Sequence, residues 1–149
     1  MRNITKISKL IEFIIDDKEN SHSEITIGKV TKRHSSIFYK TLKVHINKSA
    51  IVIDSSAIRH AMRKHSNTVR EFNRGQIAVT YNDFEHIPNI LAHPGRIEYK
   101  GKNNLKQDVF MFIKQLDNLY LVAMCVRPSK FGTKLVFGTI YIRKTKKPA

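Results

Sequence analysis

The chain has 149 residues, the size of one ordinary domain, and its 41% hydrophobic content is sufficient for a normal core. Its 27 Lys and Arg against 12 Asp and Glu give a formal charge of +15, which creates a field that attracts polyanions. Its single cysteine, Cys125, excludes an internal disulfide and a zinc site of several thiolates, and its apolar neighbours predict a buried structural thiol. Nucleic acid is therefore the first partner to consider, although a ribosome-associated or merely soluble basic protein would carry the same charge.

The first third of the chain indicates a helix and then a short strand. Apolar residues at helical spacing predict a helix over residues 4–15, which the polar run 16–24 ends. Alternating apolar residues between 25 and 30 indicate a strand. Residues 37–46 fit a strand or a helix equally well, so their assignment stays open.

Capping signals mark where the next helices begin. The β-branched run 50–53 is followed by Asp54, Ser55 and Ser56, each of which can cap a helix over residues 57–65. A further helical segment covers residues 69–73.

A capping box marks the last predicted helix. The run 80–83, Thr-Tyr-Asn-Asp, has the spacing of such a box and opens a helix that extends to Leu91 and closes at 93–95. Pro88 falls inside this helix, where a proline can break it into two short pieces.

After Gly95 the apolar periodicity changes to two, which indicates strands. The predicted strands cover residues 96–100, 108–115, 119–127 and 134–143. Turn residues at 115–118 and 128–132 join neighbouring strands into an antiparallel meander. Apolar residues on both faces of 108–115 predict that the sheet is covered, at least in part, on both sides. The fold class expected is α+β, with N-terminal helices followed by an antiparallel four-stranded meander. Residues 1–149 form a single domain with a charged, frayed tail from Lys144.

The helix predicted over 57–65 carries a dense group of chemically active side chains: Arg59, His60, Arg63, Lys64 and His65. Imidazoles can move protons near neutral pH and cations hold phosphate, as RNA cleavage without metal requires. At 100° per residue His65 lies near the centre of the apolar stripe, whereas His60 and Lys64 lie on a flank. The alternatives are a hydrogen-bonded core imidazole for His65, a surface residue for His60 and a solvated face for the cations.

The last predicted strand supplies a second group. Strand alternation places Phe137, Thr139, Tyr141 and Arg143 on one face and Val136, Ile140 and Ile142 on the other. The hydroxyl, phenol and guanidinium of the first face could contact a scissile phosphate, and Arg127, ending the neighbouring strand, could do the same. A simple surface ladder and an exposed loop cation are the alternatives.

Acidic residues do not suggest a metal site. The acids at 16–17 and 83–85 are helix-end features rather than a convergent carboxylate group, which argues against a two-metal nuclease. His86 and His93 lack a neighbouring cysteine or acid pair and are interpreted as scattered histidines. We therefore expect no metal and no cofactor.

Several segments together carry a resemblance to a known superfamily. They are Ile53-Asp54-Ser55, Ile58-Arg59-His60, Lys64-His65, the run 74–84 (RGQIAVTYNDF), Ile87-Pro88-Asn89-Ile90-Leu91 and the run 135–141 (LVFGTIY). Residues 50–143 resemble the phage and polymorphic-toxin branch of the barnase/EndoU/colicin/RelE-like (BECR) ribonuclease superfamily. The resemblance implies N-terminal helices before a four-stranded antiparallel sheet, with residues 1–49 as an extension. It also implies metal-independent RNA endonuclease activity and marks His60, His65 and Thr139 as catalytic.

The predicted function is RNA cleavage by general acid-base transesterification. One group deprotonates a ribose 2′-hydroxyl and another protonates the leaving 5′-oxygen. The predicted catalytic residues are His60, His65, Thr139 and Tyr141. The predicted phosphate-binding residues are Arg59, Arg63, Lys64, Arg127 and Arg143.

The expected partners are RNA, with tRNA as one option, and an acidic immunity or antitoxin protein that would cover the basic site. Asp16 and Asp17 interrupt the N-terminal apolar stretch, so no membrane span is expected. The expected site of action is the cytoplasm, either directly or after delivery as part of a larger toxin or phage protein. A non-catalytic basic nucleic-acid-binding domain and a phage structural or injected protein are the alternative functions.

Overall fold

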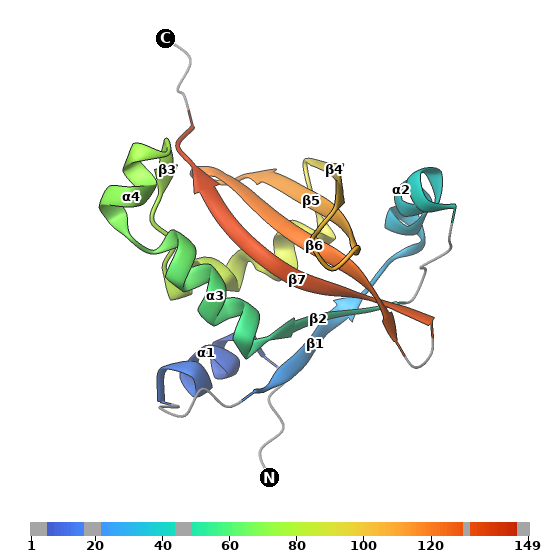
Figure 1. Cartoon of the computed structure of the whole chain (residues 1–149), viewed down its shortest axis with the longest axis horizontal. Coiled ribbons are helices and arrows are strands. Elements are labelled where there is room, and N and C mark those ends of the chain that lie inside the picture. Colours follow the sequence, from blue (N-terminus) through green and yellow to red (C-terminus); the bar gives the residue numbers. More distant parts are fainter. Residues whose placement is uncertain (1–5, 17–21, 44–48, 130–131, 146–149) are drawn as a thin grey trace.

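The computed structural model describes residues 6–16, 22–43, 49–129 and 132–145 (Figure 1). Within these ranges the helices are α1 (Ile7–Asp16), α2 (Lys32–Leu42), α3 (Ser55–His65), α4 (Thr68–Asn73), the 3-10 helix η1 (Tyr81–His86) and α5 (Ile87–Ala92). The strands are β1 (Glu24–Lys29), β2 (Ala50–Asp54), β3 (Gln76–Ile77), β4 (Arg96–Lys102), β5 (Asp108–Gln115), β6 (Leu119–Ser129) and β7 (Gly132–Arg143).

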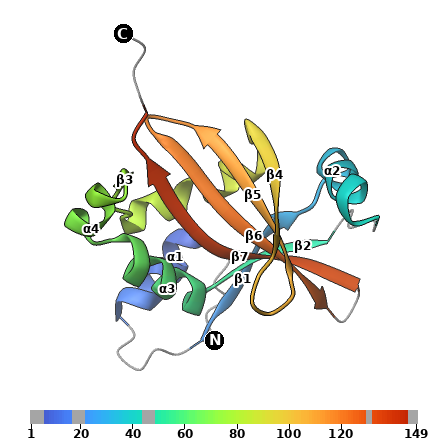
Figure 2. The same ribbon diagram turned by 45° about the horizontal axis from the view of Figure 1, so that its top comes forward.

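The sheet is larger than the predicted four-stranded meander. The four expected strands are present as the antiparallel neighbours β7-β6-β5-β4, but the described chain forms a seven-stranded sheet in the order β1-β2-β7-β6-β5-β4, with β3 also paired to β7 (Figure 2). The β-branched run in β2 pairs in parallel with β7, where Val52 lies opposite Val136, and β1 continues the sheet beyond it. The α+β class is confirmed. The helices do precede the four predicted strands, but β1, β2 and β3, which lie between helices in the chain, add to the sheet.

The open assignment at residues 37–46 is a helix as far as the structure describes it. Thr31 caps α2 by accepting a hydrogen bond from the backbone N–H of His34 at 3.2 Å. Lys43 ends the helix with a positive φ of 58°, a left-handed conformation common just after a helix. Residues 44–46 lie outside the described residues, as do Ile4 and residues 146–149 of the predicted tail.

Two predicted capping signals are confirmed. Of the three candidate caps before α3, Asp54 is the one used: its Oδ1 accepts the Ala57 N–H at 2.8 Å. Thr80 and Asp83 form the predicted capping box. The helix that follows is broken into η1 and α5. Pro88 lies in the first turn of α5, where backbone N–H groups have no partner within the helix, so a proline fits there.

The main core lies between one face of the sheet and the helices α1, α2, α3, η1 and α5. Its largest fully buried side chains include Phe38, Phe84, Phe110, Phe112 and Phe137. A smaller cluster of Met111, Ile113, Leu121 and Ala123 is buried on the other face, with Tyr141 packed against it, and we call this the Tyr141 face. Both faces are therefore partly covered, as predicted, and Cys125 is buried.

A bulge in β7 corrects one predicted side-chain direction. The register between β6 and β7 shifts so that Met124 faces Phe137 and Ala123 faces Thr139, leaving Gly138 as the extra residue. Phe137 consequently joins the main core instead of sharing a face with Thr139. A Cβ at Gly138 would lie 3.3 Å from both the Ala123 carbonyl oxygen and the Cys125 Sγ, so a glycine fits this close approach best.

Candidate active site at the α3–α4 corner and the end of β7

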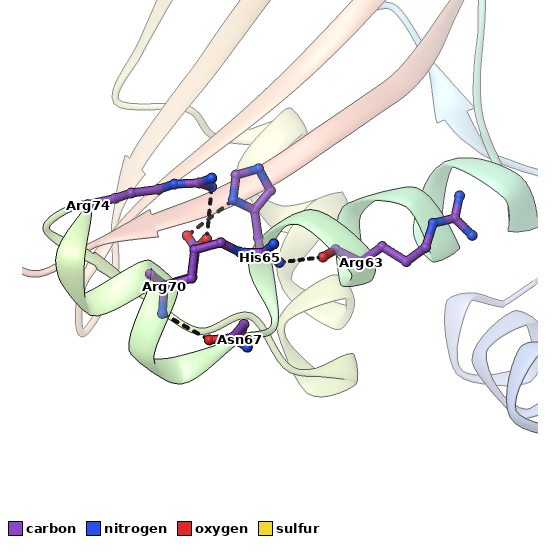
Figure 3. A network of polar contacts seen from close by, with 6 residues as sticks. Arg63, His65, Asn67, Arg70 and Arg74 are labelled. Atoms are coloured by element: carbon purple, nitrogen blue, oxygen red, sulfur yellow. Dashed lines mark hydrogen bonds and ion pairs between the residues drawn. The ribbon is translucent and has the colours of Figure 1, made fainter.

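The centre of the candidate site is a contact between the His65 imidazole and the Glu71 carboxylate. His65 Nδ1 lies 3.1 Å from Glu71 Oε2, and the Glu71 side chain is fully buried whereas that of His65 is 12% exposed. Arg74 Nη1 lies 3.3 Å from the other carboxylate oxygen, Oε1, and the Arg74 side chain is 48% exposed. One buried carboxylate is thus held between an imidazole and a guanidinium that both reach the surface (Figure 3).

Local hydrogen bonds fix the corner between α3 and α4. Asn67 caps α4, since its Oδ1 accepts the Arg70 N–H at 2.9 Å. The Arg70 side chain returns to α3 and donates to the Arg63 carbonyl oxygen at 2.6 Å (Figure 3). The Val79 N–H donates to the His65 carbonyl oxygen at 2.7 Å, which ties the end of α3 to the segment after β3. Three hydrogen bonds therefore fix the corner that carries His65.

The last strand brings Tyr141 and Arg143 to the same place. The rings of His65 and Tyr141 stack with centroids 5.8 Å apart and an angle of 30° between their planes. The Arg143 guanidinium carbon lies 5.6 Å from the centroid of the Tyr141 ring, within the range of a cation–π contact. The helix histidine and the strand side chains, which the sequence indicates as separate groups, thus meet at one corner.

Two buried oxygens near this corner have no hydrogen-bond partner within the described residues: Thr139 Oγ1 and Gln76 Oε1. Thr139 precedes Tyr141 by two residues and so lies on the same face of β7. Gln76 pairs with Arg143 in the β3–β7 ladder. Buried polar atoms are usually hydrogen-bonded, and functional sites are one recurrent place for the exceptions.

Other predicted site residues lie outside this cluster. His60 is exposed and precedes His65 by five residues, which places it about 140° away around α3. Arg63 and Lys64 are exposed on α3, and Arg59 is half-buried there. Arg127 donates from Nε to Gln107 Oε1 at 3.3 Å and pairs with Lys134, about 20 Å along β7 from Tyr141. The structure groups His65, Thr139, Tyr141 and Arg143, but it does not add His60 or Arg127 to them.

Glu71 and Phe72 are the residues that the sequence analysis missed. Glu71 is the only acid between Ser55 and Asn82 in a very basic stretch, a signal that could have attracted attention. Phe72 is 78% exposed and its neighbour on the same helix face, Val69, is 71% exposed. An exposed aromatic ring beside Arg70 and Arg74 is the combination found where proteins stack single-stranded bases.

Two features are absent from the described part of the chain. No three His, Cys, Asp or Glu side chains in this part of the chain lie close enough to hold a metal ion together. None of the described helices is long and apolar enough to cross a membrane.

Fold and site together define a class: a basic α+β protein that presents an imidazole–carboxylate pair and arginines beside the end of β7 in a largely antiparallel sheet. The family described as phage-Barnase-EndoU-ColicinE5/D-RelE like nuclease 3 matches residues 28–149, and the chain belongs to this family. The resemblance to the BECR superfamily is thereby confirmed, with a match that begins well before residue 50. No curated protein and no solved structure matches the chain. The division into an extension over 1–49 and a nuclease core over 50–143 stays a prediction.

Proposed function

We propose that this nuclease-family chain is a metal-independent RNA endonuclease that cleaves by general acid-base transesterification. The observation that carries the proposal is the His65–Glu71 pair, in which a partly exposed imidazole is hydrogen-bonded to a fully buried carboxylate. Arg74 contacts Glu71, and Arg143 contacts the Tyr141 ring that stacks on His65, which supports proton transfer and phosphate binding at one corner.

His65 is the proposed general base. A carboxylate accepts hydrogen bonds and cannot donate them, so Glu71 favours the tautomer of His65 that carries its proton on Nδ1. Nε2 of the neutral ring is then an acceptor, and among the described residues it has no hydrogen-bond partner. It would take the proton from a ribose 2′-hydroxyl. Glu71 acts through His65 and is a positioning residue.

The remaining groups of the corner would act on the phosphate. The 2′-oxygen attacks phosphorus as the bond to the 5′-oxygen breaks, and the arginines stabilise the negative charge of the transition state. Thr139 and Tyr141 offer hydroxyl donors on the same strand face, and we assign to Tyr141 the proton that the leaving 5′-oxygen requires. The products are a 2′,3′-cyclic phosphate and a 5′-hydroxyl end.

The predicted residues outside the corner have proposed roles in holding the strand. Arg59, Arg63 and Lys64 lie on α3 and would meet phosphates flanking the cleaved one. His60, on another side of α3, is the alternative to Tyr141 as the group that protonates the leaving oxygen, and Arg127 is a proposed distant phosphate contact.

The biological setting that fits this activity is a toxin or a phage effector acting in the cytoplasm. A cell that makes such an enzyme needs to block it, and a chain with a formal charge of +15 is most readily covered by an acidic immunity or antitoxin protein. Single-stranded RNA, including the loops of tRNA, is the proposed substrate class, because its bases can be splayed onto a ring such as Phe72.

The test is incubation of the purified chain with RNA and with DNA of the same sequence in the presence of a chelator. RNA should be cut to 2′,3′-cyclic phosphate ends, and a single 2′-deoxy substitution at the cut position should prevent cleavage. Binding without cleavage at every pH between about 5 and 9, where imidazoles titrate, would instead favour a non-catalytic basic binding domain or a phage structural protein.

A further inference from the structure

A second group of basic side chains lines a cavity on the opposite side of the molecule from α4. The cavity has a volume of about 370 Å³ and lies between the start of α2 and the connection from α5 to β4. In both ribbon views α2 and α4 occupy opposite ends of the molecule (Figures 1 and 2). Four of the lining residues are basic or imidazole side chains: Arg33, His34, His93 and Arg96. None of the described residues that line it carries a carboxyl group.

His34 is the most deeply placed of these groups. The residue is only 8% exposed, and its ring meets the edge of Phe112 at a centroid distance of 6.4 Å. Within the described part of the chain, its ring nitrogens have no hydrogen-bond partner. Burial lowers the pKa of His34, and the nearby charges of Arg33 and His93 lower it further. Among the described residues, no carboxylate supplies this imidazole with a counter-charge.

The start of α2 adds to the positive potential of the cavity. Arg33 and His34 are the second and third residues of this 11-residue helix, whose N-terminal end carries a partial positive charge. Anions bind readily at such helix ends when side chains complete the site. The buried His34 side chain, which has no hydrogen-bond partner among the described residues, is a second indication of a ligand, separate from the helix end.

The neighbouring charges leave the cavity positive. Arg96 Nε lies 3.3 Å from Glu98 Oε1. The Arg96 side chain is largely exposed and that of Glu98 is partly exposed, and the contact does not use the terminal guanidinium nitrogens of Arg96. Lys114 Nζ donates to the His93 carbonyl oxygen at 2.6 Å and brings one more cation to the same connection. Glu98 is thus the one carboxylate engaged with these groups among the described contacts.

We propose that this cavity binds a phosphate monoester group or free phosphate. A monoester has three terminal oxygens and a charge of about −1.5 to −2 near neutral pH, which can meet several cationic donors at once. An internal phosphodiester carries a single charge and continues as chain on both sides, so it fits a pocket less well. The natural source of this group is the 5′-phosphate end of a nucleic acid or inorganic phosphate. The site is independent of the proposed RNA cleavage.

Calorimetric titration of the full chain with inorganic phosphate, at fixed ionic strength, tests this assignment. Saturable binding of one phosphate is expected. His34→Gln and Arg33→Ala should each weaken binding by about tenfold or more, as expected for the loss of a charge-assisted hydrogen bond. Lys40→Ala, which removes an exposed cation at the other end of α2, should leave binding unchanged.

A second titration identifies the source of the phosphate. All-deoxy oligonucleotides with a 5′-phosphate and with a 5′-hydroxyl are compared, since they cannot be cut by 2′-hydroxyl attack. Preference for the phosphorylated strand that disappears in Arg33→Ala assigns the cavity to a nucleic-acid end, whereas binding of inorganic phosphate without that preference assigns it to the free ion. The proposal is wrong if neither inorganic phosphate nor the phosphorylated strand binds. It is also wrong if both bind to Arg33→Ala and to His34→Gln as tightly as to the wild-type chain. His65→Gln should not alter phosphate affinity. A failure of the phosphate proposal can therefore be distinguished from a failure of the nuclease proposal.

Discussion

His65 Nδ1 and Glu71 Oε2 lie 3.1 Å apart across the turn between α3 and α4, and the carboxylate has no exposed surface. A buried carboxylate requires compensation, which His65 and Arg74 supply here. A purely structural pair and a catalytic pair would look alike in a static view. They differ in what happens to the reaction rate when the charge of Glu71 is removed while its shape is kept.

Glu71→Gln makes this distinction. The amide keeps the volume but can donate a hydrogen bond to Nδ1, so it no longer enforces one tautomer of His65. We expect kcat to fall by about 10² with KM little changed, the usual scale for impaired acid-base catalysis. Rates are measured well below the melting temperature of the variant, with Glu85→Gln, an exposed acid on η1, as the matched control. If Glu71→Gln keeps the wild-type kcat and the wild-type pH profile, as the control should, then Glu71 is a structural residue.

Phe72→Ala tests the exposed aromatic ring beside the corner. Stacking of one base on an aromatic side chain contributes about 1–3 kcal/mol, so RNA binding should weaken by roughly 5- to 150-fold. Because Phe72 is 78% exposed, the free energy of unfolding should change by no more than about 0.5 kcal/mol. Phe72→Tyr should keep most of the affinity. Loss of stability in place of affinity would assign Phe72 to packing.

The arginines of the corner should contribute to RNA binding through phosphates. Arg143→Ala should reduce the slope of log Kd against log salt by about one unit, because one phosphate contact and its released counterions are lost. Arg74→Ala should do the same, with an added loss of stability from the Glu71 contact. Lys40→Ala lies far from the corner and serves as the comparison. Equal slopes for all three variants would indicate a diffuse basic surface.

His34 should make the protein less stable in weak acid. Its pKa in the folded chain lies below the ordinary value of 6.5, so the unfolded chain binds more protons in the interval between the two pKa values. Stability is therefore fully retained above about pH 6.5 and declines as the pH falls through the folded pKa. Denaturant unfolding at pH 7.5 and 5.5, in a buffer without phosphate, measures the loss. His34→Gln should make it smaller, and an identical loss in the variant would assign it to other groups.

Local signals predicted local structure well. The Asp54 cap, the Thr80–Asp83 capping box and β5 depend on residues close together in sequence, and each is confirmed. The pairing of Val52 with Val136 joins strands from opposite halves of the chain, and no periodicity within either segment reveals it. For the same reason the four-stranded meander was an incomplete prediction.

The candidate site shows the same division. His65 and Tyr141 could be selected by their chemistry, but their stacking depends on how α3 packs against β7. Glu71 appears in the sequence as an isolated acid, and only the turn at Asn67 directs it to His65. The direction of Phe137 could not be predicted, because an alternation pattern does not show where a bulge interrupts it.

The most direct test of the central claim is the single-turnover rate of RNA cleavage by His65→Gln, measured in chelator and compared with wild type and His60→Gln. We expect a loss of about 10² or more for His65→Gln, with RNA affinity and melting temperature close to wild type. A loss in His60→Gln as well would identify the second proton-transfer group, whereas a wild-type rate there would restrict the chemistry to the corner. A His65→Gln variant that folds and cleaves RNA at the wild-type rate would contradict the account.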